Sequence, residues 1–200
     1  MTSAHHADRS DPVGPRAADV RGRSGGVGRP TSAAAEAVSD DLRRGAGELL
    51  ARRRRIAGLS LASIGALGAV AAYQNGLLRH LPEPPLPGLD ADAVDASGEA
   101  YQALKAPDAA LGIASSAVTL VLAGMGDRHR ATQRPWVPLA LLGKVILDAA
   151  GGAFLTAEQA SRHRRFCSWC LTAAAASVAM VPQAVPEARA AASALRRRRG

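Results

Sequence analysis

Four long apolar runs dominate the pattern of hydrophobic and polar positions along this chain. They cover residues 56–78, 106–126, 136–156 and 166–186, and polar segments separate them. Each run is near the ~20 residues that an α-helix needs to cross ~30 Å of hydrocarbon. Because backbone groups in lipid must find partners within their own segment, we expect these runs to be helices. The pattern therefore predicts an all-α membrane four-helix bundle.

The ends of the chain differ in composition from its centre. Residues 1–47 are rich in Gly, Pro, Ser, Ala and Arg and show no sustained period. Such a segment cannot bury enough apolar surface to offset its conformational entropy. We therefore expect a disordered N-terminal tail over 1–47, a membrane domain over 48–187 and a basic cytoplasmic tail over 188–200. The run at 56–78 is too long for the apolar core of a secretory signal, so we expect a retained membrane helix.

The formal charge of +8 is concentrated beside the apolar runs. Arginine blocks at residues 52–55 and 196–199 flank the first and last runs. Basic clusters in this position mark the cytoplasmic side of a membrane protein. No aromatic residues lie among the arginines to stack bases, so no nucleic-acid partner is expected. With four spans, both termini face the cytoplasm, and the start of the fourth run faces the extracytoplasmic side of the cell membrane.

The loop between the first two runs has its own pattern. Residues 79–105 carry an excess of acidic side chains, and residues 81–88 are rich in proline. Proline fixes its own φ and keeps the preceding residue out of the helical region, so an extended segment is expected there. Apolar residues return at helical spacing over 91–104. The pattern predicts a short helix over the outer mouth of the bundle.

Cys167 and Cys170 are the only cysteines of the chain and stand at the start of the fourth run. Three interpretations are open: two thiols that merely pack, a metal site shared with His163, or a dithiol that cycles with a disulfide. Basic residues at 162–165 and the positive end of a helix would both favour the reactive thiolate. The extracytoplasmic side is also where disulfides form. We favour the redox interpretation.

Three further side chains are candidates for ligand contacts. Asp108 begins the second run behind a proline and either stabilises the helix end or contacts a ligand. Lys144 and Asp148 are four residues apart on the third run and can form an ion pair, and Asp148 can also relay protons. Trp169 is either an interfacial anchor or a surface on which a planar ring stacks.

These features together resemble the vitamin K epoxide reductase family in its bacterial membrane form. The resemblance covers residues 55–186 and includes the Cys-x-x-Cys pair that opens the last of four spans. Residues 94–97 (VDAS) and Tyr101 look like the family's segment before its second helix. Residues 106–112 (APDAALG) are similar to its Gly-x-Pro-Asn-x-x-x-Gly pattern.

The resemblance implies a membrane thiol–disulfide oxidoreductase that exchanges electrons with a quinone, either menaquinone or ubiquinone, without a metal. Cys167 and Cys170 would be catalytic, with the deeper Cys170 facing the quinone. Cys167, nearer the surface, would exchange with a thioredoxin-like or other dithiol protein on the outer side. Asp108, Trp169 and Asp148 would line the quinone site.

The chain departs from the family at three points. It lacks the family's second pair of cysteines in the outer loop, it has Asp108 where the family has asparagine, and Ala174 takes the place of a tyrosine. A separate dithiol protein would then have to exchange directly with Cys167. The alternative that the sequence leaves open is a non-enzymatic four-helix membrane protein whose cysteines form a structural disulfide or bind a metal.

Overall fold

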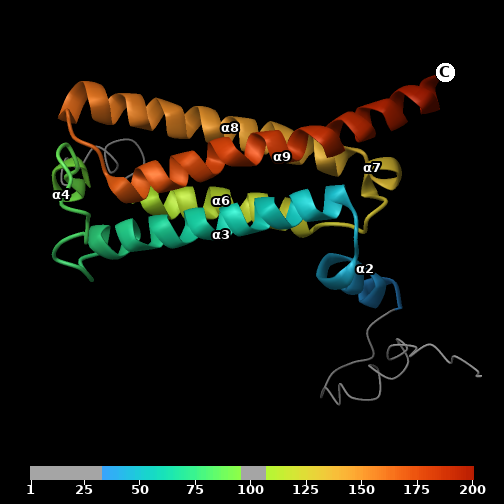
Figure 1. Cartoon of the computed structure of the whole chain (residues 1–200), viewed down its shortest axis with the longest axis horizontal. Coiled ribbons are helices and arrows are strands. Elements are labelled where there is room, and N and C mark those ends of the chain that lie inside the picture. The colour runs from blue at the N-terminus through green and yellow to red at the C-terminus, as the bar shows by residue number, and fades with distance from the viewer. Residues whose placement is uncertain (1–32, 96–106) are drawn as a thin grey trace, which may run out of the picture.

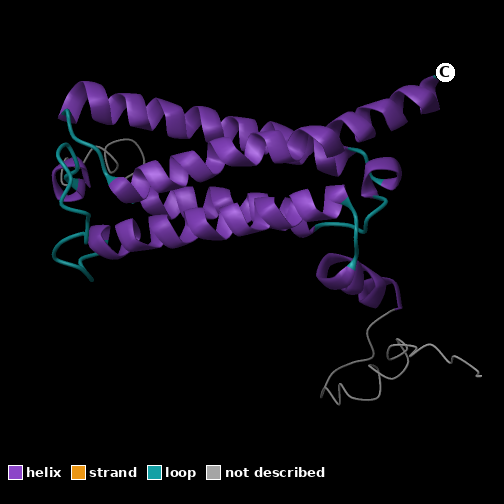
Figure 2. Cartoon of the chain, viewed as in Figure 1, coloured by secondary structure: helices purple, strands orange, loops and turns teal. Residues whose placement is uncertain are grey.

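The described part of the chain is helical (Figure 2). The computed structural model describes residues 33–95 and 107–200. Within these ranges there is no strand, and extended pairing is limited to a single bridge between Leu89 and Phe166. The all-α prediction is confirmed for this part of the chain. The elements are α2 (Ala33–Arg44), α3 (Glu48–Gln74), α4 (Ala91–Asp95), α6 (Asp108–Gly124), α7 (Arg130–Gln133), α8 (Trp136–Glu158), the π-helical turn η1 (Gln159–His163) and α9 (Ser168–Arg199).

Helices α3, α6, α8 and α9 run alongside one another (Figure 1). Helix α3 packs against α6 and α9, and α8 packs against α9, whereas α6 and α8 contact each other less. Helix α4 and the start of α9 lie at one end of this assembly, which we name the cysteine end. Helices α2 and α7 lie at the other end, which we name the arginine end.

Two clusters of buried side chains form the core, one toward each end. The cluster nearer the arginine end contains Ile56, Ala123, Leu141, Val145, Met180 and Ala184. The cluster at the cysteine end contains Val70, Leu81, Ala91, Val94, Ala109 and Cys167. The chain has few aromatic residues to fill its core. Its helices pack instead through the close approach of small residues. A Cβ added at Gly152 would lie 3.1 Å from the Cα of Ala174, which shows how closely α8 and α9 approach.

Within residues 33–95 and 107–200, three helical segments are long and apolar enough to cross a bilayer: Glu48–Gln74, Trp136–His163 and Ser168–Arg198. They contain most of the first, third and fourth predicted runs. The second predicted run, 106–126, contains the shorter apolar helix Asp108–Gly124. Gly76 and Gly126 follow the first and second of these four helices with positive φ values of 75° and 79°. Glycine adopts such values readily, so these positions end the helices earlier than hydrophobicity alone predicts.

Helix α9 continues through the segment expected to be a cytoplasmic tail. Ala188, Ala191 and Ala194 are buried, and α9 contacts α7 here. Pro186 removes a backbone donor from the helix, which leaves the carbonyl of Pro182 without its usual partner. The guanidinium of Arg52 donates to that oxygen over 3.4 Å. Packing by small residues therefore extends the helix beyond the apolar run.

A buried ion pair reinforces the arginine end. Arg130 donates from Nε and Nη2 to the two carboxylate oxygens of Glu187, over 2.7 and 2.6 Å. The side chains are 0% and 5% exposed. Arg130 also donates to the carbonyls of Leu122 and Met125 at the end of α6. The two charges can be buried because each is paired with the opposite charge and is hydrogen-bonded.

The expected disordered tail is helical where the structure describes it, because α2 covers Ala33–Arg44. Residues 1–32 lie outside the described residues. The side chain of Arg54 donates to the carbonyls of Asp41, Leu42 and Gly45 over 2.7–3.2 Å. The carbonyls of Asp41 and Leu42 belong to the last turn of α2, where carbonyls lack partners farther along the helix, although that of Asp41 also accepts from the N–H of Gly45 over 3.0 Å. A contact from α3, which composition does not reveal, thus stabilises the end of α2.

The loop that follows α3, described over residues 75–95, lies at the cysteine end, and we keep for it the name outer loop from its predicted side. Residues 81–86 form no helix, and α4 begins at Ala91, where the sequence predicts the start of a short helix over 91–104. Residues 96–106 of that prediction lie outside the described residues. Oδ1 of Asp92 accepts from the backbone N–H of Leu81 over 2.9 Å, and Oδ2 pairs with His80 over 2.7 Å. These two hydrogen bonds lower the pKa of Asp92, and the one from Leu81 has the larger effect.

Candidate functional site

Cys167 caps the N-terminus of α9. Its backbone is extended, with φ −94° and ψ 118°, and its Sγ accepts a hydrogen bond from the backbone N–H of Cys170 over 3.3 Å. The two sulfurs are not joined by a disulfide bond in this structure. Cys167 stands at the end of the helix and Cys170 one turn farther in, but the side chain of Cys167 is 0% exposed, whereas Cys170 is half-buried.

The outer loop buries Cys167. The backbone N–H of Phe166 donates to the carbonyl of Gly88 over 2.9 Å, and the N–H of Asp90 donates to the carbonyl of Phe166 over 3.0 Å. This pairing holds residues 88–90 beside the residue that precedes Cys167. The side chains of Ala91 and Val94 then complete the buried cluster that contains the cysteine. The sequence could not reveal this cover, because it depends on pairing between segments far apart in the chain.

Glu83 fastens the same loop to α9. Its Oε1 accepts from the N–H of Ser168 and its Oε2 accepts from the N–H of Ala91, both over 2.6 Å. One carboxylate thus accepts hydrogen bonds from backbone N–H groups in the first turns of both α9 and α4. Such N–H groups have no partner within their own helix, and negative charge is favoured at a helix N-terminus. Sequence reasoning missed Glu83, which we counted only toward the acidity of the loop. Its place between prolines gives no signal of this role.

A cavity of about 790 Å³ lies among the four long helices at the cysteine end. This size is within the usual range for a small-molecule pocket. Small and apolar residues such as Gly112, Gly151 and Ala174 form much of its wall. Its chemically distinctive lining residues are Cys170, Asp108, Ser115, Lys144, Asp148 and Gln159.

The cavity brings together three of the five predicted site residues, namely Cys170, Asp108 and Asp148. Cys167 and Trp169 do not line it. The indole N–H of Trp169 instead donates to the carbonyl of Pro82 over 2.9 Å, so this side chain contacts the outer loop. Gln159 joins the two cysteine environments: it lines the cavity, and its Oε1 accepts from the N–H of Cys167 over 3.1 Å.

Asp108 is the first residue of α6 and lies at the rim of the cavity. Its Oδ1 accepts from the Nε2 of Gln74 over 2.5 Å, and Gln74 Oε1 in turn accepts a longer bond from the N–H of Ala109. The carboxylate therefore sits in the first helical turn, where its charge is favourable, and ties the end of α3 to the start of α6. Both interpretations of Asp108, helix end and ligand contact, are compatible with this position.

Lys144 and Asp148 form the predicted ion pair, with Nζ 2.5 and 2.6 Å from the two carboxylate oxygens. Ser115 accepts from Lys144 over 2.7 Å and donates to Asp148 over 2.8 Å. Thr119 donates to Asp148 over 3.0 Å. Sequence reasoning assigned Lys144 only to the ion pair and did not single out Ser115. The structure places both on the cavity wall.

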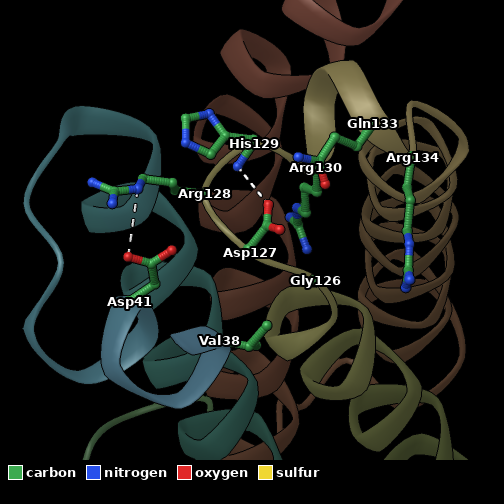
Figure 3. A pocket seen from close by; sticks show the side chains of 9 residues that line it. All are labelled: Val38, Asp41, Gly126, Asp127, Arg128, His129, Arg130, Gln133 and Arg134. Carbon is green, nitrogen blue, oxygen red and sulfur yellow. Dashed lines mark hydrogen bonds and ion pairs between the residues drawn. The ribbon is translucent and has the colours of Figure 1, made fainter. Parts of the chain in front are cut away.

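A second cavity, of about 370 Å³, lies at the arginine end and contains no cysteine (Figure 3). It is formed between α2 and the segment around α7. Arg128 pairs with Asp41 over 3.5 Å, and the N–H of His129 donates to Asp127 over 2.7 Å. The pair between Arg128 and Asp41 joins α2 to the loop before α7, and the hydrogen bond of His129 lies within that loop.

A metal site is not assembled in the structured regions 33–95 and 107–200, where no group of three His, Cys, Asp or Glu side chains converges. His163, the third ligand of the metal interpretation, lines the cavity without completing such a group with the cysteines.

Comparison with known families identifies the chain. The model of the vitamin K epoxide reductase family matches residues 55–185, which is more than half of the sequence. The chain belongs to the vitamin K epoxide reductase family. No curated protein and no solved structure matches it. Family membership, together with three helices of sufficient length and apolar character, indicates a membrane protein and, in general terms, a thiol–disulfide oxidoreductase.

Proposed function

We propose that this protein transfers electrons between the Cys167–Cys170 pair and a membrane quinone. The observation that carries the proposal is that Cys170 lines a mainly apolar cavity large enough for a substituted ring. A cysteine pair with one thiol facing such a cavity within a helical bundle is suited to a lipid-soluble oxidant. A water-soluble oxidant would need no cavity of this kind.

In the proposed membrane arrangement, α3, α6, α8 and α9 all cross the bilayer within a domain spanning about residues 48–187. The three longer helices span it by length, and the shorter α6 is held between α3 and α8. The arginine end, with the basic blocks at 52–55 and 196–199, faces the cytoplasm. Both termini are then cytoplasmic, and the cysteine end faces the extracytoplasmic side of the cell membrane.

The reaction balances without any further reactant. In the direction of quinone reduction, the two thiols lose two electrons and two protons and form a disulfide. The quinone gains both electrons and both protons and leaves as the quinol. The thiol of Cys170, on the cavity wall, reacts with the quinone, and Cys167, at the N-terminal cap, supplies the second sulfur. An external dithiol protein of the thioredoxin type then reduces the disulfide by thiol–disulfide exchange and is itself oxidised.

The burial of Cys167 makes this exchange depend on the outer loop. A thiolate attacks a disulfide sulfur only if it can approach that atom. A partner protein therefore reaches Cys167 only after two sets of hydrogen bonds break. These are the bonds of Glu83 and the bonds that pair residues 88–90 with Phe166. Because this chain lacks the family's extra loop cysteines, we infer that opening of this loop takes their place in admitting the electron donor.

A quinone-reduction assay tests the proposal. The full-length protein in nanodiscs is supplied with dithiothreitol and a short-chain ubiquinone or menaquinone, and quinol formation is followed by absorbance. We expect turnover by the wild type and its loss in Cys167→Ser and Cys170→Ser. Ser168→Ala, between the cysteines, is the matched control and should retain activity because its backbone N–H, which bonds to Glu83, is unchanged. Equal rates in the wild type and both cysteine variants would contradict the proposal and favour a structural role for the pair.

A further inference from the structure

The Lys144–Asp148 pair lies inside the same cavity as Cys170 and is largely withdrawn from solvent. The side chains are 19% and 15% exposed. Charged side chains within membrane-spanning helices are costly and mark functional sites by default. A helix that merely needed packing at these two positions would be served by apolar residues. The pair therefore calls for an explanation beyond its mutual attraction.

The position of the pair complements that of Asp108. Ser115 and Thr119, which hold Lys144 and Asp148, follow Asp108 by seven and eleven residues on α6. Seven residues of α-helix rise about 10 Å. The cavity thus has polar groups at two depths, near its rim and about 10 Å farther in. This separation is similar to the length of a p-quinone ring with a hydrogen bond at each of its two oxygens.

The ammonium group of Lys144 is held by four acceptors that surround its three N–H groups. Both carboxylate oxygens of Asp148 accept from it over 2.5 and 2.6 Å, and the hydroxyl of Ser115 accepts over 2.7 Å. Its contact with Thr119, at 3.5 Å, is at the outer limit of a hydrogen bond. A quinone oxygen that enters the cavity would therefore take one of these N–H groups in exchange for an acceptor that the group already has. Asp148 and the two hydroxyls hold the ammonium group in place, so its charge is oriented before any ligand arrives.

We propose that Lys144 is a catalytic residue that donates a hydrogen bond to the inner carbonyl oxygen of the quinone. This inference rests on the proposed function and adds the group that stabilises the reduced ring. As the two electrons pass from the cysteine sulfurs to the ring, negative charge develops on that oxygen, and the fixed ammonium group stabilises it. Lys144 keeps its proton throughout, because the two protons of the quinol balance the two lost by the thiols. Asp148 and Ser115 are positioning residues for Lys144.

The competing explanation is that the pair only ties α6 to α8, which otherwise contact each other little. The double variant Lys144→Leu/Asp148→Leu separates the two explanations. Replacing a buried ion pair by apolar residues of similar size is often neutral or stabilising for a fold, whereas removing one partner alone leaves an unpaired charge. A structural tie predicts that the folded double variant remains active. A catalytic Lys144 predicts that it does not.

The experiment measures kcat and KM for a short-chain quinone from pH 5.5 to 8.5, with thermal unfolding of each variant as the check on folding. We expect kcat of the double variant to fall about 100- to 1,000-fold, by analogy with the loss of one oxyanion-stabilising donor. Its remaining rate should decline more steeply with rising pH than that of the wild type, because solvent protons must then neutralise the oxygen. Lys144→Arg should recover part of the loss.

The control is Asp40→Asn/Arg44→Gln, which removes an ion pair of the same i, i+4 spacing outside the cavity and should leave kcat unchanged. If the double variant does not fold, Lys144→Gln should lower kcat more than Asp148→Asn, and equal losses would overturn the assignment. A folded double variant with wild-type kcat and pH profile would also overturn it. Absence of quinone reduction by the wild type is a different result, because it refutes the proposed function itself.

Discussion

The backbone N–H of Cys170 donates a hydrogen bond to Sγ of Cys167 over 3.3 Å, so the sulfur of the first cysteine is the N-terminal cap of α9. The two cysteines lie one helical turn apart and therefore have different surroundings. Cys167 is buried under the outer loop, and Cys170 lines the cavity. Each of these surroundings leads to a separate test.

The cap predicts that serine and alanine are not equivalent replacements for Cys167. A serine hydroxyl can accept the same N–H, whereas alanine leaves that donor without a partner. We expect Cys167→Ala to lower the free energy of unfolding by about 1 kcal/mol relative to Cys167→Ser. Reversible unfolding in mixed detergent micelles measures the difference. Equal stability of the two variants would show that the sulfur does not act as a cap.

The hydrogen bonds of Glu83 should control how readily a reagent reaches Cys167. Glu83→Ala removes both acceptors and Glu83→Gln leaves one oxygen to accept, so the loop should open more often in the order wild type, Gln, Ala. Each lost bond to a charged acceptor is worth about 1.5–3 kcal/mol. We expect maleimide labelling of Cys167, in a Cys170→Ser background, to accelerate about tenfold or more in Glu83→Ala. Glu48→Gln, an exposed acid in α3, is the control. Unchanged labelling in Glu83→Ala would mean that other contacts keep the loop closed.

Two adjacent glycines of α8 should respond differently to alanine. A Cβ at Gly152 would lie 3.1 Å from the Cα of Ala174, whereas a Cβ at Gly151 has no atom within 4 Å. Overpacking at Gly152 should cost about 1–3 kcal/mol of unfolding free energy. Gly151→Ala should cost nothing or stabilise slightly, because alanine suits a helix better than glycine. Thermal unfolding of the two variants measures this, and a similar loss in both would contradict the α8–α9 contact.

The lowered pKa of Asp92 predicts how the stability of the loop depends on pH. The hydrogen bonds from Leu81 and His80 lower the pKa of this carboxyl from its ordinary value of 3.8. Because the folded pKa is depressed, the stabilisation is present above pH 3.8 and is lost as the pH falls through the folded value. Hydrogen exchange of peptides covering residues 80–83, corrected for the intrinsic rate, should show protection that declines over that range. Asp92→Asn should lower the protection at neutral pH and remove this acid dependence.

The fold class and the ion pair could be predicted from the sequence because both depend on local spacing. Uninterrupted apolar runs predict helices, and residues four apart on a helix meet, as Lys144 and Asp148 do. The ends of the helices were less predictable. Helix α9 continues past residue 186 with buried alanines and contacts α7, and hydropathy does not register such packing.

The surroundings of the cysteines could not be predicted from the sequence. Spacing places Cys167 and Cys170 near each other but does not say which is covered. The cover arises from Glu83 and from Leu89 beside Phe166, pairs that are far apart in the chain. Trp169 illustrates the same limit, because its indole N–H finds a carbonyl of the proline-rich loop and not the cavity.

Protection of Cys170 by quinone tests the central claim most directly. In Cys167→Ser, which keeps the cap, Cys170 is the sole thiol, and its alkylation by an apolar maleimide can be followed by mass spectrometry. The proposed function predicts that short-chain ubiquinone or menaquinone slows this alkylation in a saturable manner, because the ring and the reagent compete for one cavity. An alkylation rate that stays constant up to the solubility limit of both quinones would contradict the placement of the quinone beside Cys170.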